Sequence, residues 1–335
     1  MNIRDRQGLK SEAKRLLGEA AYDPRKLVLL HTGASALLLL VITAVNFALS
    51  NQMDSAVGLR GLDTRTILGT IQSALETVST LALPFWNMGY IFAVMGWLRG
   101  KQVGPRTLLD GFRHLGPVLR LQLVKSLLFG GLATLCFYPS VIIFMLTPLA
   151  NPMIEALMPI AETATVADME MLMADPRVTE AIGQASLPML AVFAVVFLLA
   201  ALPMFYRLRM SEYALVDDPK AGAFAALRSS RRMMRGNCLA LLRLDLSFWW
   251  FYALELLLAV VCYGDALLPM VGVELPFSTT VAFFLFYILN LGGQVALYWW
   301  KKNEVTLPYA VAYETLRSAP PEPRPVAQSP IWSQE

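Results

Sequence analysis

The chain has 335 residues, of which 56% are hydrophobic and only 16% are charged. A soluble domain of this length would carry about 25% charged residues, so the composition argues against a water-soluble protein and favours one whose surface is mostly lipid. The net charge of +3 carries little information, because the charges are segregated along the chain rather than mixed.

Six long apolar runs predict an all-α, polytopic membrane fold. Each run has about 20 residues or more, which is enough to cross a hydrocarbon core of about 30 Å. The first run is too long for the apolar part of a signal peptide, so we expect it to be an uncleaved first span. The runs pair into three predicted transmembrane hairpins. They cover residues 27–49, 71–98, 119–149, 187–206, 244–268 and 277–300.

The segments that join these runs alternate in charge. Three basic residues, Arg60, Arg65 and Arg177, lie on one side of the predicted hairpins. The rest of the 28 Lys and Arg residues lie in the N-terminus, 99–125, 207–243 and the C-terminal tail. Because basic loops stay in the cytoplasm, we expect both termini to lie there, in a bacterial plasma membrane.

Cytoplasmic segments with helical periodicity precede each hairpin. They are the N-terminal segment 1–26, a second one around 108–115 and a third at 219–236. Asp23-Pro24 is a typical helix start before the first span. The pattern favours three repeats, each a surface helix followed by a hairpin. Three hairpins that are alike only because each crosses the membrane twice would produce the same arrangement. A last amphipathic piece, 308–316, follows the sixth run and completes a membrane domain over 27–316.

Two further segments stand outside the spans. The outer loop 151–186 is acidic, and it lacks the dense carboxylate loop of an EF-hand, so we expect a solvated cap with a short helix near Met169. The tail 317–335 is polar and rich in proline, and it is predicted to be disordered.

The predicted helix 219–235 carries a basic face. Its basic side chains fall within an arc of about 120° at helical spacing, with Phe224 among them. They are Lys220, Arg228, Arg231, Arg232 and Arg235. Such a face suits anionic lipid headgroups. Ordinary positive-inside topology charge explains the same residues equally simply.

Polar side chains within the apolar runs form a second candidate site. Glu255 is predicted about 16 Å into the fifth span, at nearly the depth of Asn290 in the sixth. Gln294 lies one turn from Asn290, and Asn87 lies near the middle of the second span. These four residues form a candidate intramembrane cluster for a proton, an ion or a substrate. The alternative is that they only join helices through hydrogen bonds.

The stretch 206–246 resembles a known family. It reads Tyr-Arg-Leu-Arg-Met-Ser-Glu-Tyr-Ala-Leu-Val-Asp-Asp-Pro at 206–219, Ala-Leu-Arg-Ser-Ser-Arg-Arg-Met-Met-Arg-Gly-Asn at 226–237 and Leu-Asp-Leu-Ser-Phe-Trp at 244–249. With Leu-Pro-Tyr at 307–309 and Gly111-Phe112, this pattern is similar to domain of unknown function 975, a bacterial family of multi-pass membrane proteins. The acidic outer loop and the Ala-Leu-Pro-Met at 201–204 depart from the family pattern. The resemblance implies an architecture and a bacterial origin, and it supplies no catalytic residues.

The chain lacks the patterns of common membrane enzymes. It has two histidines and no HExxH, GxSxG, Walker A or GxGxxG motif. Cys136, Cys238 and Cys262 are isolated, as small packing residues are. We therefore expect no enzymatic activity, no metal, no cofactor and no nucleic-acid partner.

We expect a protein that binds membrane lipid or a lipid-linked envelope precursor. The alternatives are a small transporter or channel coupled through Glu255, and an assembly scaffold with a membrane-protein partner or a second copy of the chain.

Overall fold

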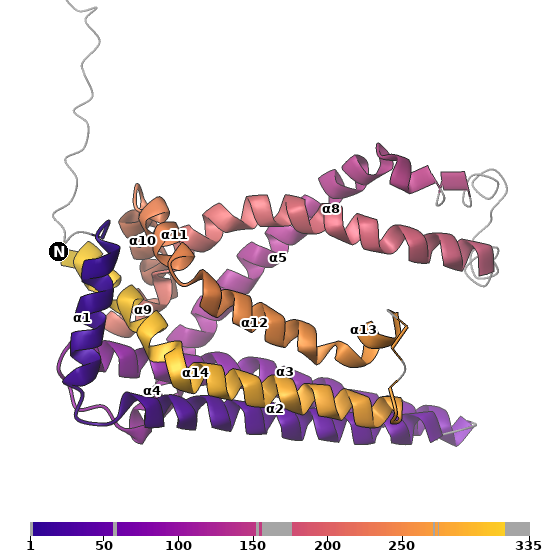
Figure 1. Ribbon diagram of the computed structural model, residues 1–335, viewed down its shortest axis with the longest axis horizontal. Coiled ribbons are helices and arrows are strands. Elements are labelled where there is room, and N and C mark those ends of the chain that lie inside the picture. Colours follow the sequence, from indigo (N-terminus) through magenta and orange to yellow (C-terminus); the bar gives the residue numbers. More distant parts are fainter. Residues whose placement is uncertain are drawn as a thin grey trace, which may run out of the picture. The chain divides into compact units, whose positions relative to one another are not determined.

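The computed structural model describes residues 3–55, 59–151, 154–155, 176–270, 272–273 and 275–318, and these residues form helices and turns with no strand. Figure 1 shows the helices in colours that follow the sequence. Their bounds are α1 Arg6–Gly18, α2 Pro24–Ser55, α3 Leu59–Leu98, η1 Pro105–Leu109, α4 Asp110–Arg113, α5 Leu115–Met145, η2 Pro148–Ala150, α8 Pro176–Leu208, α9 Ser211–Asp217, α10 Gly222–Met234, α11 Cys238–Leu246, α12 Trp249–Cys262, α13 Gly264–Met270 and α14 Thr279–Ser318.

Five helices in the described part of the chain are long and apolar enough to cross a membrane: α2, α3, α5, α8 and α14. They coincide with five of the six predicted runs. A sixth is added if α11 and α12 are counted as one bent span. Asp23 starts α2 as expected, since its side chain accepts a hydrogen bond from the Arg25 amide at 2.9 Å.

The fifth run is not the continuous helix that its apolar sequence predicts. α11 ends at Leu246, α12 begins at Trp249, and the two helices are bent by 68° at this break. The Tyr309 hydroxyl on α14 donates a hydrogen bond to Asp245 on one side of the break. Lys10 on α1 donates to the Ser247 carbonyl at 3.3 Å. Side chains from two other helices therefore hold the bend.

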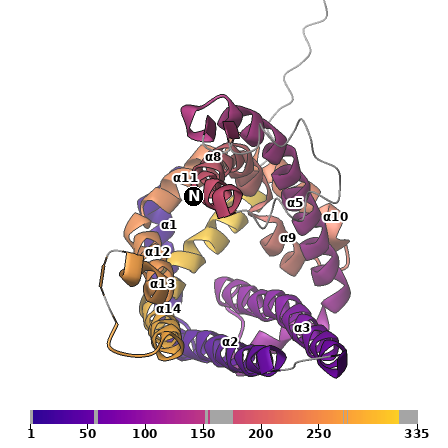
Figure 2. The same ribbon diagram turned by 90° about the vertical axis from the view of Figure 1, so that its right-hand side faces the viewer.

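The chain divides into two compact units, of which the first contains Met1–His114 and Leu239–Glu335. Within it α2 packs against both α14 and α3, and α12 packs on α14 (Figure 2). Polar contacts reinforce this packing: Thr43 of α2 donates to Tyr287 of α14 at 3.0 Å, and Tyr90 of α3 donates to Asn303 of α14 at 2.8 Å. The first and last spans of the sequence are therefore neighbours.

α14 continues 18 residues beyond Trp300, the predicted end of the sixth run. The expected amphipathic piece 308–316 is therefore the last part of the same helix, with Pro308 inside it. A helix of 40 residues is about 60 Å long, twice the thickness of a hydrocarbon core, so part of α14 must lie outside the membrane. Its buried stretch from Asn303 to Tyr313 packs against α1.

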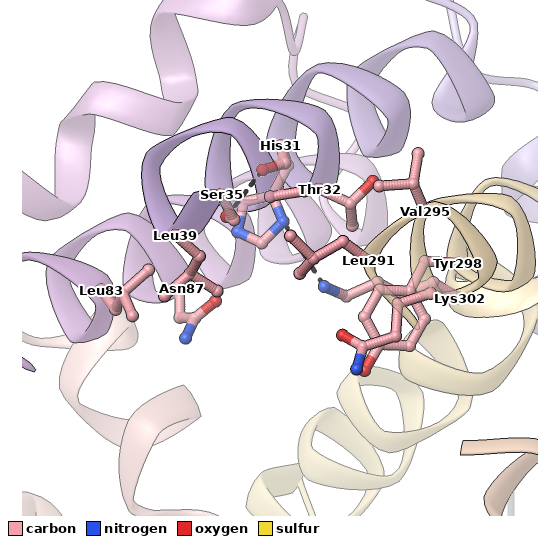
Figure 3. A pocket seen from close by; sticks show the side chains of 12 residues that line it. His31, Thr32, Ser35, Leu39, Leu83, Asn87, Leu291, Val295, Tyr298 and Lys302 are labelled. Atoms are coloured by element: carbon pink, nitrogen blue, oxygen red, sulfur yellow. Dashed lines mark hydrogen bonds between the residues drawn. The ribbon is translucent and has the colours of Figure 1, made fainter. Parts of the chain in front are cut away.

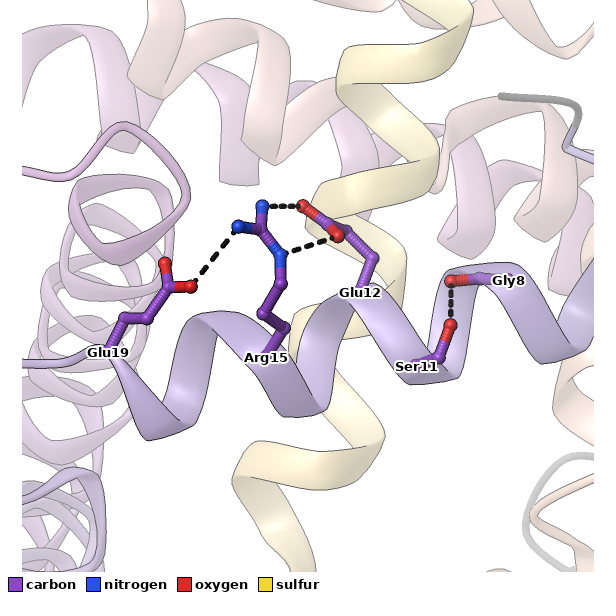
Figure 4. Close-up of polar contacts among 5 residues, drawn as sticks. All are labelled: Gly8, Ser11, Glu12, Arg15 and Glu19. Carbon is purple, nitrogen blue, oxygen red and sulfur yellow. Dashed lines mark hydrogen bonds and ion pairs between the residues drawn. The ribbon is translucent and has the colours of Figure 1, made fainter.

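α1 is the amphipathic helix that the N-terminal periodicity predicts. Leu9 and Ala13 are buried, and α1 packs on α14 and α3. Burial, with a smaller contribution from neighbouring basic residues, lowers the pKa of Lys10. On the exposed face, Arg15 pairs with Glu12 at 2.6 Å and Glu19 at 3.1 Å (Figure 4). The hydrogen bond from Arg15 lowers the pKa of the Glu12 carboxyl.

The second unit contains Leu115–Cys238. α5 packs on α8, and α10 packs on α9, α5 and α8. The buried Ser230 hydroxyl of α10 donates to the Arg207 carbonyl at 2.8 Å and accepts from the Met210 amide at 3.1 Å, which fixes α10 to the end of α8. Lys125 of α5 pairs with Glu212 of α9 at 2.6 Å.

The boundaries of two predicted segments differ from the structure. The basic helix begins at Gly222 rather than at residue 219, because Asp218 accepts hydrogen bonds from the amides of Lys220 and Ala221 in a turn. Part of the predicted outer loop, from Pro176, already belongs to α8. The predicted short helix near Met169 and the tail from 319 onward lie outside the described residues.

The predicted helix around 108–115 is instead a 3-10 turn, η1, followed by the single helical turn of α4. This segment approaches α3 very closely. A Cβ added at Gly111 would lie 1.9 Å from the Phe85 carbonyl oxygen, and one added at Gly89 would lie 1.8 Å from that of Leu108. Both neighbours are backbone atoms that cannot rotate away, so the contact requires glycine on both sides.

We expect Gly111→Ala to destabilise the first unit by about 2 kcal/mol or more, because an overpacked contact with rigid backbone can only be relieved by moving the segment away from α3. The measurement is the thermal unfolding midpoint in detergent, which should fall by about 4 °C or more. Gly33→Ala is the control, since a Cβ at Gly33 meets no atom within 4 Å. Equal midpoints for the two variants would contradict the tight contact.

Candidate pocket between α2, α3 and α14

The structure separates the predicted intramembrane cluster into two parts. Asn290 is buried on α14, where its side chain donates to the Leu258 carbonyl of α12. Gln294 donates to the Asn290 side-chain oxygen at 3.0 Å. In the described part of the chain no hydrogen bond joins Glu255 of α12 to either of them. Asn290 and Gln294 therefore form one pair, which Asn290 links to α12, and Glu255 is not part of it.

The break before Trp249 explains this separation. Counted from Leu244, Glu255 would lie about 16 Å along a continuous helix. Because α12 begins only at Trp249, Glu255 lies six residues, or about 9 Å, into it. Asn290 is ten residues from Trp300 and so lies about 15 Å deep. Glu255 thus lies about 6 Å nearer to that end than Asn290 does.

A pocket of about 250 Å³ lies in the first unit (Figure 3). Three helices supply its walls, and α2 and α14 contribute most of them. The lining residues are His31, Thr32, Ser35, Ala36 and Leu39 from α2, Leu83 and Asn87 from α3, and Leu291, Gln294, Val295, Tyr298 and Lys302 from α14.

His31 is the most deeply placed polar group of the pocket, with 2% of its surface exposed. Its ring stacks on Trp86 at 5.6 Å, and its backbone carbonyl accepts a hydrogen bond from the Trp86 indole at 2.9 Å. Nδ1 lies 3.4 Å from Lys302 Nζ. The Asn87 amide lies beside the ring, but Nε2 has no hydrogen-bond partner in normal geometry. A buried ring nitrogen without a partner is costly unless a ligand or water supplies one.

Lys302 is partly buried at the same end of the pocket. Its ammonium group lies over the rings of Tyr298 and Tyr90, with centroid distances of 4.6 and 4.8 Å. In the described part of the chain no carboxylate lies within ion-pair distance of it, and Glu255 attracts it from further away. Its neighbour Lys301 is different, because it pairs directly with Glu304 at 2.8 Å. Lys302 thus differs from Lys301 in having no carboxylate in direct contact.

The pocket changes from polar to apolar in the same direction on all three helices. On α2 the polar His31, Thr32 and Ser35 precede Ala36 and Leu39. On α3 and α14, which run back toward the same end, the apolar Leu83 and Leu291 come before Asn87 and Lys302. One end of the pocket thus offers cationic and hydrogen-bonding groups, and the other end offers aliphatic side chains.

The hydroxyl groups of the pocket bond to their own helix. Thr32 donates to the Val28 carbonyl at 2.8 Å, and Ser35 donates to the His31 carbonyl at 2.8 Å. Neither hydroxyl is bonded to the His31 ring as an activated nucleophile would be. Among the described residues, no group of three or more His, Cys, Asp or Glu is placed to hold a metal ion.

The basic face of α10 is exposed in the second unit. Ala223, Ala226, Leu227, Ser230 and Met234 form the buried side of the helix. Arg228, Arg231 and Arg232 lie on the opposite side of α10, and Lys220 and Arg235 lie just before and just after the helix; all five predicted basic residues are exposed. None of these five forms an ion pair with the described residues. Phe224 lies on this side with 69% of its surface exposed.

A comparison with known families gives a match over residues 3–293, to the family described as a protein of unknown function (DUF975). The chain belongs to this family. The match covers nearly the whole chain, and it includes the α2 and α3 residues that line the pocket and, of the α14 lining residues, Leu291. No curated protein and no solved structure matches the chain.

Three pocket residues were not predicted from the sequence: His31, Tyr298 and Lys302. The sequence does contain a pattern that indicates a shared site. Gln294, Tyr298 and Lys302 recur every four residues, so they lie on one face of a helix. His31 and Ser35 have the same spacing. Lys302 follows two tryptophans and another lysine, and this context makes it resemble an ordinary anchor at a membrane surface.

Proposed function

We propose that this protein binds an amphiphile with an anionic headgroup, either a membrane lipid or a lipid-linked envelope precursor, in the pocket between α2, α3 and α14. The observation that carries the proposal is the polar-to-apolar change along the pocket. A phosphate or carboxylate would lie near Lys302 and His31, and an acyl chain would extend past Leu39 and Leu83. Lysine commonly binds phosphate as a point charge, and the unpartnered Nε2 of His31 offers a further hydrogen bond.

In this proposal the chain crosses a bacterial plasma membrane six times in three hairpins, with α11 and α12 together forming the fifth crossing. Both termini lie in the cytoplasm, as the charges of the connecting segments favour. The polar end of the pocket then faces the cytoplasmic leaflet, because His31 lies only seven residues from the start of α2. Headgroups of that leaflet lie at this level.

The side chains of the pocket favour non-covalent binding over catalysis by a nucleophile. The pocket hydroxyls are bonded to backbone carbonyls of their own helix. The most unusual groups, Lys302 and His31, are suited to holding an anion rather than to activating a nucleophile.

We expect Lys302→Gln to reduce the retention of phosphatidylglycerol relative to phosphatidylethanolamine by about tenfold, because the substitution removes the only cation of the pocket lining. The measurement is native mass spectrometry of the full chain with both lipids supplied in equal amounts. Lys301→Gln is the matched control, since it removes the same charge one residue away outside the pocket. If the two variants retain the same lipids as the wild type, the pocket does not select a headgroup.

The basic face of α10 would contribute a second, weaker attraction for anionic lipid. Each exposed basic residue near a membrane surface contributes about 1 kcal/mol, and this attraction is screened by salt. We expect the combined change of Arg231, Arg232 and Arg235 to Gln to reduce association with anionic lipid at low salt and to have little effect at high salt. Unchanged association at low salt would show that these arginines only set the topology.

A small transporter is the second candidate function, and Glu255 is the observation that favours it. In this candidate function Glu255, an ionisable side chain within the apolar helix α12, exchanges a proton during a transport cycle. In liposomes with an internal pH-sensitive dye, the wild type should then carry protons across the membrane in response to a pH gradient, and Glu255→Gln should not. Proton flux that is absent from the wild type, or equal in both proteins, would count against transport.

A further inference from the structure

The His31 ring is held in one orientation by the aromatic side chains around it. It stacks on Trp86 with an angle of 4° between the two ring planes, and the Tyr90 ring lies against it at a centroid distance of 5.0 Å. The Trp86 indole also donates to the His31 carbonyl at 2.9 Å, which ties the stacking ring to the same turn of α2. The two nitrogens of the His31 ring therefore have fixed and different surroundings.

The contact with Lys302 determines which ring nitrogen of His31 carries the proton. Lys302 Nζ lies 3.4 Å from Nδ1. Because an ammonium group can only donate hydrogen bonds, Nδ1 accepts one, and the proton of the neutral ring then lies on Nε2. Nε2 is thus a hydrogen-bond donor, and it is the buried ring atom that has no partner. Such a donor favours any ligand that brings an acceptor to it.

This unpartnered donor lies between the cation and the apolar part of the pocket. Figure 3 shows Lys302 on one side of the His31 ring, and Asn87, Leu39 and Leu83 on the other side. Asn87 makes no hydrogen bond to Nε2. A ligand that extends from Lys302 toward the two leucines therefore passes the donor on its way.

We propose that His31 Nε2 recognises the ester carbonyl of an acyl chain, and that the ligand is an ester-linked glycerolipid with an anionic headgroup. The inference rests on the proposed function and adds which class of amphiphile the pocket selects. In such a lipid the phosphate, the ester carbonyls and the acyl chains follow one another in the order of Lys302, His31 and the leucines. A polyprenyl phosphate, by contrast, joins its phosphate directly to a hydrocarbon chain and leaves the donor unpaired.

A lipid without carbonyl oxygens tests this contact alone. Phosphatidylglycerol with two ether-linked chains has the charge and the headgroup of the ordinary diester, but it lacks the carbonyls. We expect the wild type to bind the diester about tenfold more tightly than the diether, because the diether leaves a buried donor unpaired.

Two substitutions of His31 have different expected effects. His31→Phe keeps an aromatic ring beside Trp86 and removes both nitrogens, so this variant should bind the diester and the diether equally. His31→Gln places an amide donor near the position of Nε2, so it should retain a preference for the diester. His114→Phe is the matched control, since His114 also stacks on an aromatic ring, that of Phe92 at 5.2 Å, and does not line the pocket.

The experiment titrates each lipid into the purified full chain in detergent and measures the bound fraction by native mass spectrometry. The lipids are diester and diether phosphatidylglycerol, diester phosphatidylethanolamine and a polyprenyl phosphate. The proteins are the wild type, H31F, H31Q and H114F, and thermal unfolding midpoints show whether each variant is folded.

A spectroscopic measurement on the wild type tests the same contact and decides the matter if H31F does not fold. The chain has two histidines, so isotopic labelling of histidine nitrogen gives nuclear magnetic resonance signals from two rings, and H114F identifies those of His31. The Nε2–H signal of His31 should shift when the diester is added and should not shift with the diether. A proton found on Nδ1 instead of Nε2 would overturn the inference.

The outcomes separate this inference from the proposed function. A preference for the diester that is lost in H31F, and kept in H31Q and H114F, supports the carbonyl contact. Equal binding of diester and diether by the wild type, a preference that persists in H31F, or tighter binding of the polyprenyl phosphate overturns it. The proposed function still stands in those cases if the wild type prefers phosphatidylglycerol to phosphatidylethanolamine. If the wild type distinguishes neither the headgroups nor the linkages, both are overturned.

Discussion

The packing of α14 is the constraint on which the first unit depends. This one helix contacts α1, α2, α3, α12 and α13, so it positions the first span, the second span and the N-terminal helix relative to each other. Its length allows this, because a helix of about 60 Å has one part inside the hydrocarbon and another outside it. The part outside the hydrocarbon packs against α1, and its Tyr309 holds the bend at Ser247. The inner part forms one wall of the pocket, so both features depend on the same rigid element.

The polar groups of the first unit follow two different rules. Most of them are satisfied locally or between helices, as the hydrocarbon environment requires. Thr32 and Ser35 bond to their own helix, and Asn290 bonds across to α12. Such contacts join helices, and they contribute about 0.6 kcal/mol each. His31 and Lys302 depart from this rule, since one has an unpartnered ring nitrogen and the other has no carboxylate in contact. Asn46 and Trp97 also have a buried atom without a partner, so the particular feature of the pocket is that the His31 ring lies 3.4 Å from the Lys302 ammonium group.

Hydropathy and helical period predict much of this fold, because they report directly on which residues can face lipid. The spans of α2, α3, α5, α8 and α14, the buried side of α1 and the start of α2 at Asp23-Pro24 all follow from such local patterns. The break between α11 and α12 does not, because Leu-Asp-Leu-Ser-Phe-Trp contains neither proline nor glycine. It is held by Lys10 and Tyr309, which are distant in the sequence. The single turn of α4 likewise depends on the approach of Gly111 to α3, which no local pattern reports.

The same break determines which candidate residues meet. A straight fifth span places Glu255 opposite Asn290, and the cluster then contains one carboxylate and several amides. The break shifts Glu255 by the length of more than one helical turn, and Asn290 bonds to the Leu258 carbonyl of α12 instead. The bend at Ser247 therefore changes which side chains meet as well as the path of the chain.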